Sequence, residues 1–222
     1  MSIFKRLAAK LPSRWQDELK RIHFTRQISN GTFITDEPEY NILNDFILPG
    51  DWVIDIGANV GHYTKRFSEL VGDSGRVIAF EPVPTTFCLL SSNVQQFIHS
   101  NVTLINSAVS DKLNIVGMSL PTFSTGLTNY YEANVTPRAG SDLNVLTLSL
   151  DSMNIHQHIS LIKIDAEGHE DFVLAGMQAL LKRHHPVLII ENPSQAVCQS
   201  LADLGYTSRV LPGSPNQMFS IQ

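Results

Sequence analysis

Cysteine, long apolar runs and surplus positive charge are all scarce in this chain of 222 residues. Its two cysteines, Cys88 and Cys198, form no CxxC pair, so they predict neither a metal ribbon nor a disulfide framework, and each is expected to be a small buried side chain. No stretch is long and apolar enough for a signal peptide or a transmembrane span, so a cytoplasmic protein is expected. The net charge of −5 disfavours a nucleic-acid partner, which attracts basic proteins.

The basic residues that are present gather near the amino-terminal end. Residues 1–30 carry a charge of +5, so the remaining residues carry −10. Apolar residues recur among these charges at helical spacing, and Pro12 predicts a break. Residues 1–48 are therefore expected to form a helical lead-in, and residues 49–222 the main domain. The lead-in either packs on that domain or touches a partner or a membrane surface, which would hold the protein at the inner face of a membrane.

Short apolar runs alternate with helical segments from residue 52 onward. The runs predict strands at 52–56, 76–80, 102–105, 161–164 and 186–190. Helical spacing predicts helices at 62–71, 84–98, 168–183 and 194–204. This order is typical of an α/β domain with a mostly parallel sheet and helices on both faces. Segments 206–211 and 217–221 flank a Pro-Gly turn and predict a terminal antiparallel hairpin, which gives a sheet of seven strands.

Residues 112–150 interrupt this alternation. Segments 115–120 and 143–150 predict strands, and a polar stretch at 122–141 separates them. Long loops in compact domains are often functional, so this insertion is expected either near the mouth of a site or as a solvated hairpin without a role.

A glycine-containing turn joins the first predicted strand to its helix. Gly57 and Gly61 let the backbone approach a nucleotide-like ligand, and Asn59 tolerates the left-handed conformation between them. Glu81 follows the second strand, 20 residues beyond Gly61, where an acid can accept hydrogen bonds from ribose hydroxyls. The turn is GxxxG rather than GxGxxG, and Asp55 can anchor a cationic aminopropyl group. The pattern therefore favours S-adenosylmethionine over NAD.

Acidic residues and a histidine follow the fourth predicted strand. At its carboxyl end, where open α/β sheets bind ligands, lie Asp165, Glu167, His169 and Glu170. His169 is the natural base for taking a proton from an acceptor hydroxyl, with Asp165 and Glu191 as alternatives or as orienting groups. On another interpretation, Glu167 and Glu170 only complement the dipole of the helix that follows.

Two further interpretations attach to the same residues. Lys163, just inside the strand, is expected to pair with Asp165 or Glu191. A divalent metal could also find oxygen and nitrogen donors here, but the spacing matches no tight metal motif, so no metal is assigned.

Four segments in this order resemble the FkbM-type family of S-adenosylmethionine-dependent methyltransferases. They are DIGANVG at 55–61, FEP at 80–82, LIKIDAEGHE at 161–170 and IE at 190–191. Many families share the glycine turn, whereas the third segment is much more specific. The resemblance covers about residues 50–192.

The resemblance implies a Rossmann-like class I methyltransferase fold, S-adenosylmethionine as cofactor, and O-methylation of a hydroxyl on a sugar, glycan or natural product. Cofactor contacts are expected at Asp55, Gly57, Ala58, Asn59, Gly61, Glu81 and Asp165. Positions near the adenine are expected for Asn106, Ser107 and Ala108. The family pattern says little about the acceptor, so a small-molecule or glycan acceptor is expected without further identity.

Three alternative functions remain open. An NAD-dependent oxidoreductase is disfavoured by the glycine pattern. An amino-methylating enzyme of nucleic acids would carry an Asn/Asp-Pro-Pro-aromatic segment after the fourth strand, where this sequence has DAEG at 165–168. A non-catalytic binding module on the same fold would keep the pocket as a scaffold.

Overall fold

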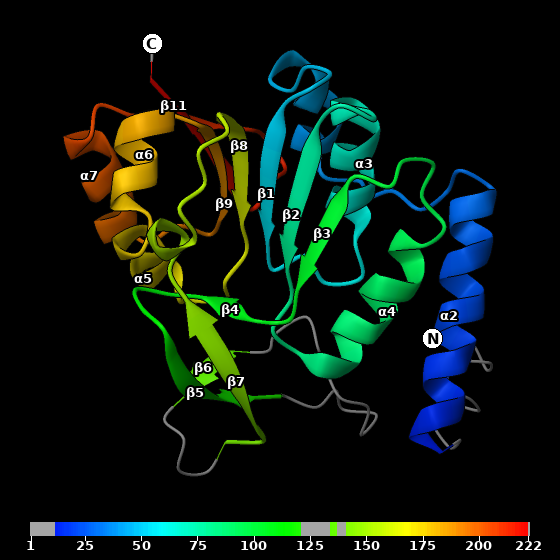
Figure 1. Cartoon of the computed structure of the whole chain (residues 1–222). Coiled ribbons are helices and arrows are strands. Elements are labelled where there is room, and N and C mark those ends of the chain that lie inside the picture. Colours follow the sequence, from blue (N-terminus) through cyan, green and yellow to red (C-terminus); the bar gives the residue numbers. More distant parts are fainter. Residues whose placement is uncertain (1–11, 121–133, 137–140, 222) are drawn as a thin grey trace.

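The computed structural model describes residues 12–120, 134–136 and 141–221 (Figure 1). Expectations that concern residues 1–11 and most of the polar stretch at 122–141 lie outside this part of the chain. The central element is a sheet of seven strands. Its strands are β1 (Trp52–Ile56), β2 (Arg76–Phe80), β3 (Val102–Ile105), β8 (Ile159–Ile164), β9 (Val187–Glu191), β10 (Thr207–Val210) and β11 (Asn216–Ser220).

The order of these strands is β10-β11-β9-β8-β1-β2-β3. The five strands from β3 to β9 run parallel, and β11 runs antiparallel to both β9 and β10. Ile56 pairs with Phe80 of β2 and with Ile164 of β8, so these three strands end together. The expected α/β fold, with a mostly parallel sheet and a terminal hairpin, is confirmed.

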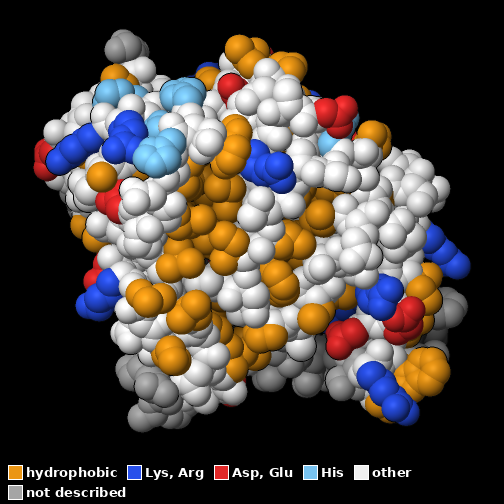
Figure 2. Space-filling view, in the orientation of Figure 1, with side chains coloured by type: hydrophobic (Ala, Val, Ile, Leu, Met, Phe, Trp, Pro, Cys, Tyr) orange, Lys and Arg blue, Asp and Glu red, His pale blue; other side chains and the backbone are white. Residues whose placement is uncertain are grey.

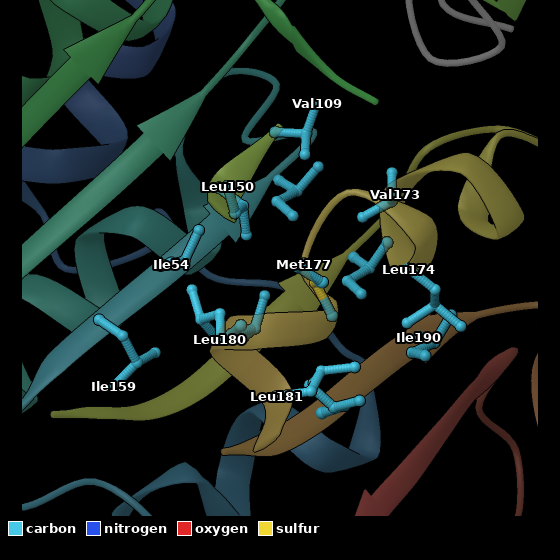
Figure 3. Close-up of a cluster of buried hydrophobic side chains, with 14 of the residues drawn as sticks. Ile54, Val109, Leu150, Ile159, Val173, Leu174, Met177, Leu180, Leu181 and Ile190 are labelled. Carbon is cyan, nitrogen blue, oxygen red and sulfur yellow. The ribbon is translucent and has the colours of Figure 1, made fainter. Parts of the chain in front are cut away.

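Helices cover both faces of this sheet (Figure 1). They are α3 (His62–Val71), α4 (Pro84–Val94), α5 (Glu170–Ala175), α6 (Gln178–His184) and α7 (Gln195–Asp203). Successive residues of a strand point to opposite faces, so Val53 packs with Phe67 of α3, whereas Ile54 belongs to the cluster on the other face. Figure 3 shows that second cluster, which includes Met177 between α5 and α6, Leu181 of α6 and Ile190 of β9.

The single helix expected at 168–183 is wrong, because the chain forms two short helices, α5 and α6. They are separated at Gly176 and Met177. A Cβ atom on Gly176 would lie 2.0 Å from the carbonyl oxygen of Ser110, and the Met177 side chain is fully buried (Figure 3). Close packing on both sides therefore determines where the helix is interrupted.

The helix expected at 84–98 is shorter than predicted, since α4 ends at Val94. Cys88 on this helix is exposed, so the expectation that it is buried is wrong. Cys198 on α7 is partly buried and packs against the core.

A second, smaller sheet follows β3. Its strands are β4 (Ala108–Val109), β5 (Asn114–Ser119), β6 (Asn134–Thr136) and β7 (Leu143–Leu148), in the order β4-β7-β5-β6, and η3 (Leu150–Met153) comes next. Met118 and Val145 pack with Ala108 and with Val83 at the start of α4. Figure 1 shows this sheet beneath the carboxyl ends of β1 and β2. The two strands expected in the insertion correspond to β5 and β7.

The described part of the lead-in forms α2 (Ser13–Ser29) and a 3-10 helix, η1 (Pro38–Asp45). Helix α2 lies beside α4 (Figure 1), and its Phe24 and Ile28 pack against Phe33, Val60 and Leu89. Of the helices within residues 12–120, 134–136 and 141–221, none combines the length and the apolar character needed to cross a bilayer.

Candidate active site

Three adjoining pockets, here called hollows, open where β1, β2, β8 and β9 end. The apolar hollow lies between Phe80, Val83, Ala108, Val109 and Met118. The Tyr63 hollow is lined by Thr35, Glu37, Asp55, Ala58, His62, Tyr63 and Lys163. The Glu191 hollow is lined by Glu167, Gly168, Glu170, Glu191 and Asn192. Asp165 lines all three, and Gly57 and Asn59 line the first two, so the expected cofactor turn lies at their junction.

The turn after β1 needs glycine for steric reasons. Gly57 has φ +75°, and a Cβ atom there would lie 2.0 Å from the carbonyl oxygen of Asp165. Asn59 adopts the expected left-handed conformation at φ +49°. A Cβ atom on Gly61 would lie 2.7 Å from Leu90 Cδ1 of α4, and Gly61 lines none of the three hollows. Gly57 therefore brings the ends of β1 and β8 together, whereas Gly61 lets α3 approach α4.

Glu81 holds the turn and faces the apolar hollow. Its carboxylate accepts hydrogen bonds from the backbone N–H groups of Asn59 and Val83, both at 2.9 Å. Burial raises the pKa of Glu81 to about 7, although these two N–H groups lower it in part. Glu81 is therefore a buried acid whose ionised form gains from any further hydrogen-bond donor in the hollow.

The pKa of Glu81 predicts a pH-dependent affinity for a ribose-containing ligand. Ribose hydroxyls donate to the ionised carboxylate, so affinity should rise about tenfold between pH 6 and pH 8 and then level off above the pKa. Calorimetric titration with S-adenosylhomocysteine at three pH values measures this. In Glu81→Gln the affinity should be weaker and almost independent of pH; an unchanged slope in that variant would assign the proton to another group.

The three residues expected near the adenine have different positions. Ser107 and Ala108 line the apolar hollow. Asn106 does not line it; its Nδ2 donates to the carbonyl oxygens of Glu81, at 2.8 Å, and Pro82, at 3.1 Å. Asn106 thus braces the loop that carries Glu81.

The Tyr63 hollow is strongly acidic. Asp55 is fully buried; its Oδ2 accepts from Thr64 Oγ1 at 2.6 Å, and its Oδ1 has no partner among the described residues. Burial raises the pKa of Asp55, while Lys163 and Thr64 act in the opposite direction. Burial also lowers the pKa of His62 to about 4, so this ring adds no positive charge at neutral pH.

Lys163 is the cation at the centre of the acidic groups. Its Nζ lies 3.1 Å from Asp165 Oδ2, as the sequence suggested, and 4.9 Å from the centroid of the Tyr63 ring. Burial alone would lower the pKa of Lys163, but Asp165 and Asp55 raise it further than burial lowers it. The lysine therefore stays charged and offsets only part of the negative charge around the turn.

A buried network that the sequence did not reveal closes the far side of the Tyr63 hollow. The Tyr63 hydroxyl lies within hydrogen-bond distance of Glu37 and, at 3.0 Å, of Glu39 Oε1. Asn216 of β11 donates through Nδ2 to the same two carboxylates. The network joins the lead-in to the terminal hairpin across 177 residues, and no local motif marks such a contact.

The network predicts a stability difference between two tyrosines. Tyr63→Phe removes a donor from buried carboxylates and should lower the free energy of unfolding by about 1–3 kcal/mol. Tyr206→Phe is the matched control, because the Tyr206 hydroxyl is buried without a partner in the described part of the chain. Its loss should change stability by less than about 1 kcal/mol. Urea unfolding measures both; equal losses would contradict the assignment.

His169 lies in the wall of the apolar hollow, at the start of α5. Its Nε2 lies 2.9 Å from Ser110 Oγ, and its ring stacks on Phe172 with centroids 4.5 Å apart. Burial lowers the pKa of His169, and Asp111 opposes only part of this effect. His169 is thus a neutral, packed ring that lines the apolar hollow, whereas Glu191 lines the Glu191 hollow.

The Glu191 hollow contains a coupled carboxyl pair. Burial, together with the charge of Asp165 and a hydrogen bond to it, raises the pKa of Glu191 to about 8. Glu170 has a different role, since its Oε1 accepts from the N–H groups of Ala166, at 3.3 Å, and Gly168, at 3.1 Å. Glu170 therefore orders the loop, while Glu191 is an acid of raised pKa that is hydrogen-bonded to Asp165 beside the hollow.

The donor types proposed for a metal do not converge. His169 lines the apolar hollow and Glu191 lines its own, although Asp165 and Glu167 line both. Among the residues that the structure describes, no group of three or more His, Cys, Asp or Glu side chains is arranged to hold a metal ion.

Solved structures similar to this chain share its fold. The methyltransferase FkbM from Methylobacillus flagellatus KT aligns with a TM-score of 0.56 and 13% identity, over 92% of this chain and 60% of that one. An rRNA methylase from Streptococcus thermophilus aligns with a TM-score of 0.50 and 12% identity, over 83% and 95%. Aeropyrum pernix fibrillarin, solved with S-adenosyl-L-methionine bound, aligns with a TM-score of 0.50 and 12% identity, over 82% and 73%. The expected class I methyltransferase fold is confirmed.

The family follows from the sequence match. The methyltransferase FkbM domain matches residues 55–207, which is more than half of the chain. No curated protein matches the sequence. The chain spans 60% of the length of the M. flagellatus protein. The match extends from the glycine turn past Glu191, and the resemblance seen in the sequence is confirmed: this chain belongs to the FkbM methyltransferase family.

Proposed function

We propose that this chain is an S-adenosylmethionine-dependent O-methyltransferase whose acceptor is a hydroxyl of a sugar, glycan or natural product. One observation carries the proposal: Asp165 separates the hollows beside the glycine turn from a hollow that holds a carboxyl pair. Such an arrangement can position a methyl donor and a hydroxyl on two sides of one side chain.

The residues around the turn fit a cationic adenosyl cofactor. Glu81 accepts from ribose hydroxyls, and the unpartnered Oδ1 of Asp55 is available to an ammonium group. Glu37, Asp55 and Asp165 outnumber Lys163 in the Tyr63 hollow. This charge favours a sulfonium and an ammonium, and it disfavours the pyrophosphate of NAD.

The proposal assigns the base to Glu191, paired with Asp165. Bound S-adenosylmethionine would supply a methyl group on a sulfur that leaves as a neutral thioether. Glu191 accepts the proton of the acceptor hydroxyl while the oxygen forms its bond to the methyl carbon, and Asp165 stabilises the proton on the pair. His169, which the sequence favoured as base, lines the apolar hollow, where it contacts Ser110 and stacks on Phe172, so the proposal gives it a packing role.

The walls of the Glu191 hollow restrict the acceptor. Asp165, Glu167, Glu170 and Glu191 all contribute carboxyl groups there, and no basic residue of the described chain lines it. Carboxylates accept hydrogen bonds from several hydroxyls at once and repel phosphates. A neutral polyhydroxyl compound is therefore the proposed acceptor class.

Calorimetry and methyl transfer test the proposal in sequence. S-adenosylhomocysteine should bind and NAD should not; binding of NAD alone would replace the proposal with an oxidoreductase. Labelled methyl groups should then pass from S-adenosylmethionine into a neutral glycan or polyol fraction and not into RNA. Cofactor binding without transfer into any fraction would point to a binding module.

A further inference from the structure

Helix α2 has a second apolar face that the rest of the described chain leaves uncovered. Trp15, Leu19 and Ile22 are 55%, 45% and 42% exposed. Their spacing of four and three residues aligns them along one side of the helix. Phe24 and Ile28, on the opposite side, already pack against the body of the protein. The exposed stripe is thus not needed to fix α2 in place.

Basic residues outnumber acidic ones on the helix that carries this stripe. Helix α2 carries Arg14, Lys20, Arg21 and Arg26 against Asp17 and Glu18. The ion pairs Lys20–Asp17, at 3.5 Å, and Arg21–Glu18, at 3.4 Å, join exposed side chains and are weak. Figure 2 shows hydrophobic side chains together with basic and acidic ones at the edge of the molecule where Figure 1 places α2.

The charge of the whole chain is polarised in the same direction. Residues 1–30 carry +5 and the remainder −10. Of these charged residues, four basic and two acidic ones lie on α2, so an anionic surface attracts this helix and repels the acidic remainder of the chain, which favours one orientation.

We propose that α2 docks through Trp15, Leu19 and Ile22 on the surface of an anionic lipid bilayer. An exposed apolar stripe on a helix with a surplus of arginine and lysine is a feature of helices that lie in the membrane interface. A second copy of the chain would bring two basic helices together, and a nucleic acid would leave the three apolar side chains without a partner. An anionic bilayer offers negative headgroups to the basic residues and an apolar interior to Trp15, Leu19 and Ile22.

The fluorescence of Trp15 gives a direct readout. The chain has two tryptophans, so Trp52→Phe leaves Trp15 as the reporter. Vesicles of phosphatidylcholine with ~30% phosphatidylglycerol should shift its emission to the blue at about 50 mM salt. Pure phosphatidylcholine, or about 500 mM salt, should abolish most of the shift. No shift with anionic vesicles at low salt would overturn the proposal.

A matched pair of double variants tests the stripe itself. Leu19→Glu with Ile22→Glu should lower the vesicle-bound fraction in sedimentation at least about tenfold. Leu113→Glu with Ile115→Glu adds the same charge at two exposed apolar positions, one just before β5 and one within it, 72% and 47% exposed, and should bind far better. Equal vesicle binding by the two variants would show that the added negative charge, and not the loss of the apolar stripe, weakens binding, and would overturn the proposal.

Two other occupants of the stripe are distinguishable. Trp15 emission that is already blue-shifted in a monomer without vesicles would assign the stripe to residues 1–11. Concentration-dependent dimerisation that the Leu19→Glu and Ile22→Glu changes abolish would assign it to a second copy. Either result would overturn bilayer docking, and neither affects the proposed methyl transfer.

Discussion

Gly57→Ala should abolish cofactor binding, with an affinity for S-adenosylhomocysteine at least about 100-fold below that of the unmodified protein. The added Cβ atom would lie 2.0 Å from the backbone carbonyl oxygen of Asp165, which cannot rotate away as a side chain could. The ends of β1 and β8 must separate to relieve this contact. That movement displaces Asp165, the wall common to all three hollows.

Gly205→Ala is the control for Gly57→Ala. Gly205 follows α7 at φ +88°, and a Cβ atom there meets nothing within 4 Å. Both substitutions place alanine in the left-handed region, which costs about 1–2 kcal/mol. Only Gly57→Ala adds the collision, so the difference in calorimetric affinity between the two isolates it. Thermal melts verify that both variants fold; similar binding by the two would show that the turn is not in contact with the cofactor.

Glu191→Gln should lower kcat by about 10²–10⁴-fold while S-adenosylhomocysteine binding stays within about threefold. Glutamine keeps the size of the side chain but cannot take a proton from the acceptor. Glu191 lines its own hollow and neither of the hollows beside the glycine turn, which separates catalysis from cofactor binding. His169→Ala should reduce kcat by a smaller factor. A larger loss of kcat in His169→Ala than in Glu191→Gln would identify His169 as the base.

The pH profile gives a second measure of the same assignment. The pKa of Glu191 is about 8, so its basic form increases as pH rises toward that value. The kcat/KM should increase about tenfold per pH unit below pH 8 and become flat above it. Because the charge of Asp165 and its hydrogen bond help to raise the pKa of Glu191, the position of this limb depends on both residues. It should disappear in Glu191→Gln.

The strands were predictable because the large sheet is built from local patterns. Apolar runs such as 52–56 and 76–80 reappear with the same bounds as β1 and β2, since burial of both sheet faces leaves a continuous apolar signal. The single helix predicted at 168–183 was wrong because a contact with a distant segment interrupts it. Gly176 bends the chain against the carbonyl of Ser110, and a contact across 66 residues leaves no trace in helical periodicity.

Some residues of the candidate site were also predictable from local patterns, whereas others depend on contacts between distant segments. Asp55 lies near the end of β1, and Gly57, Glu81 and Asp165 directly follow the neighbouring strands β1, β2 and β8, so parallel topology alone brings them together. Lys163 could be paired with Asp165 because the two are neighbours along one strand. Glu37 and Asn216 could not be found, because they sit outside every motif and meet only after the hairpin docks on β9. The buried state of Glu39 likewise depends on that distant contact.

The Glu39–Asn216 contact has a consequence for synthesis on the ribosome. Translation is vectorial, and Glu39 emerges 177 residues before its amide partner. Until β11 inserts beside β9, this carboxylate lacks a donor that its native burial requires, so the nascent chain gains little by sequestering it. The Tyr63 hollow should therefore acquire its final shape late, when β11 joins the sheet, and binding of a ligand there by incomplete chains should be poor.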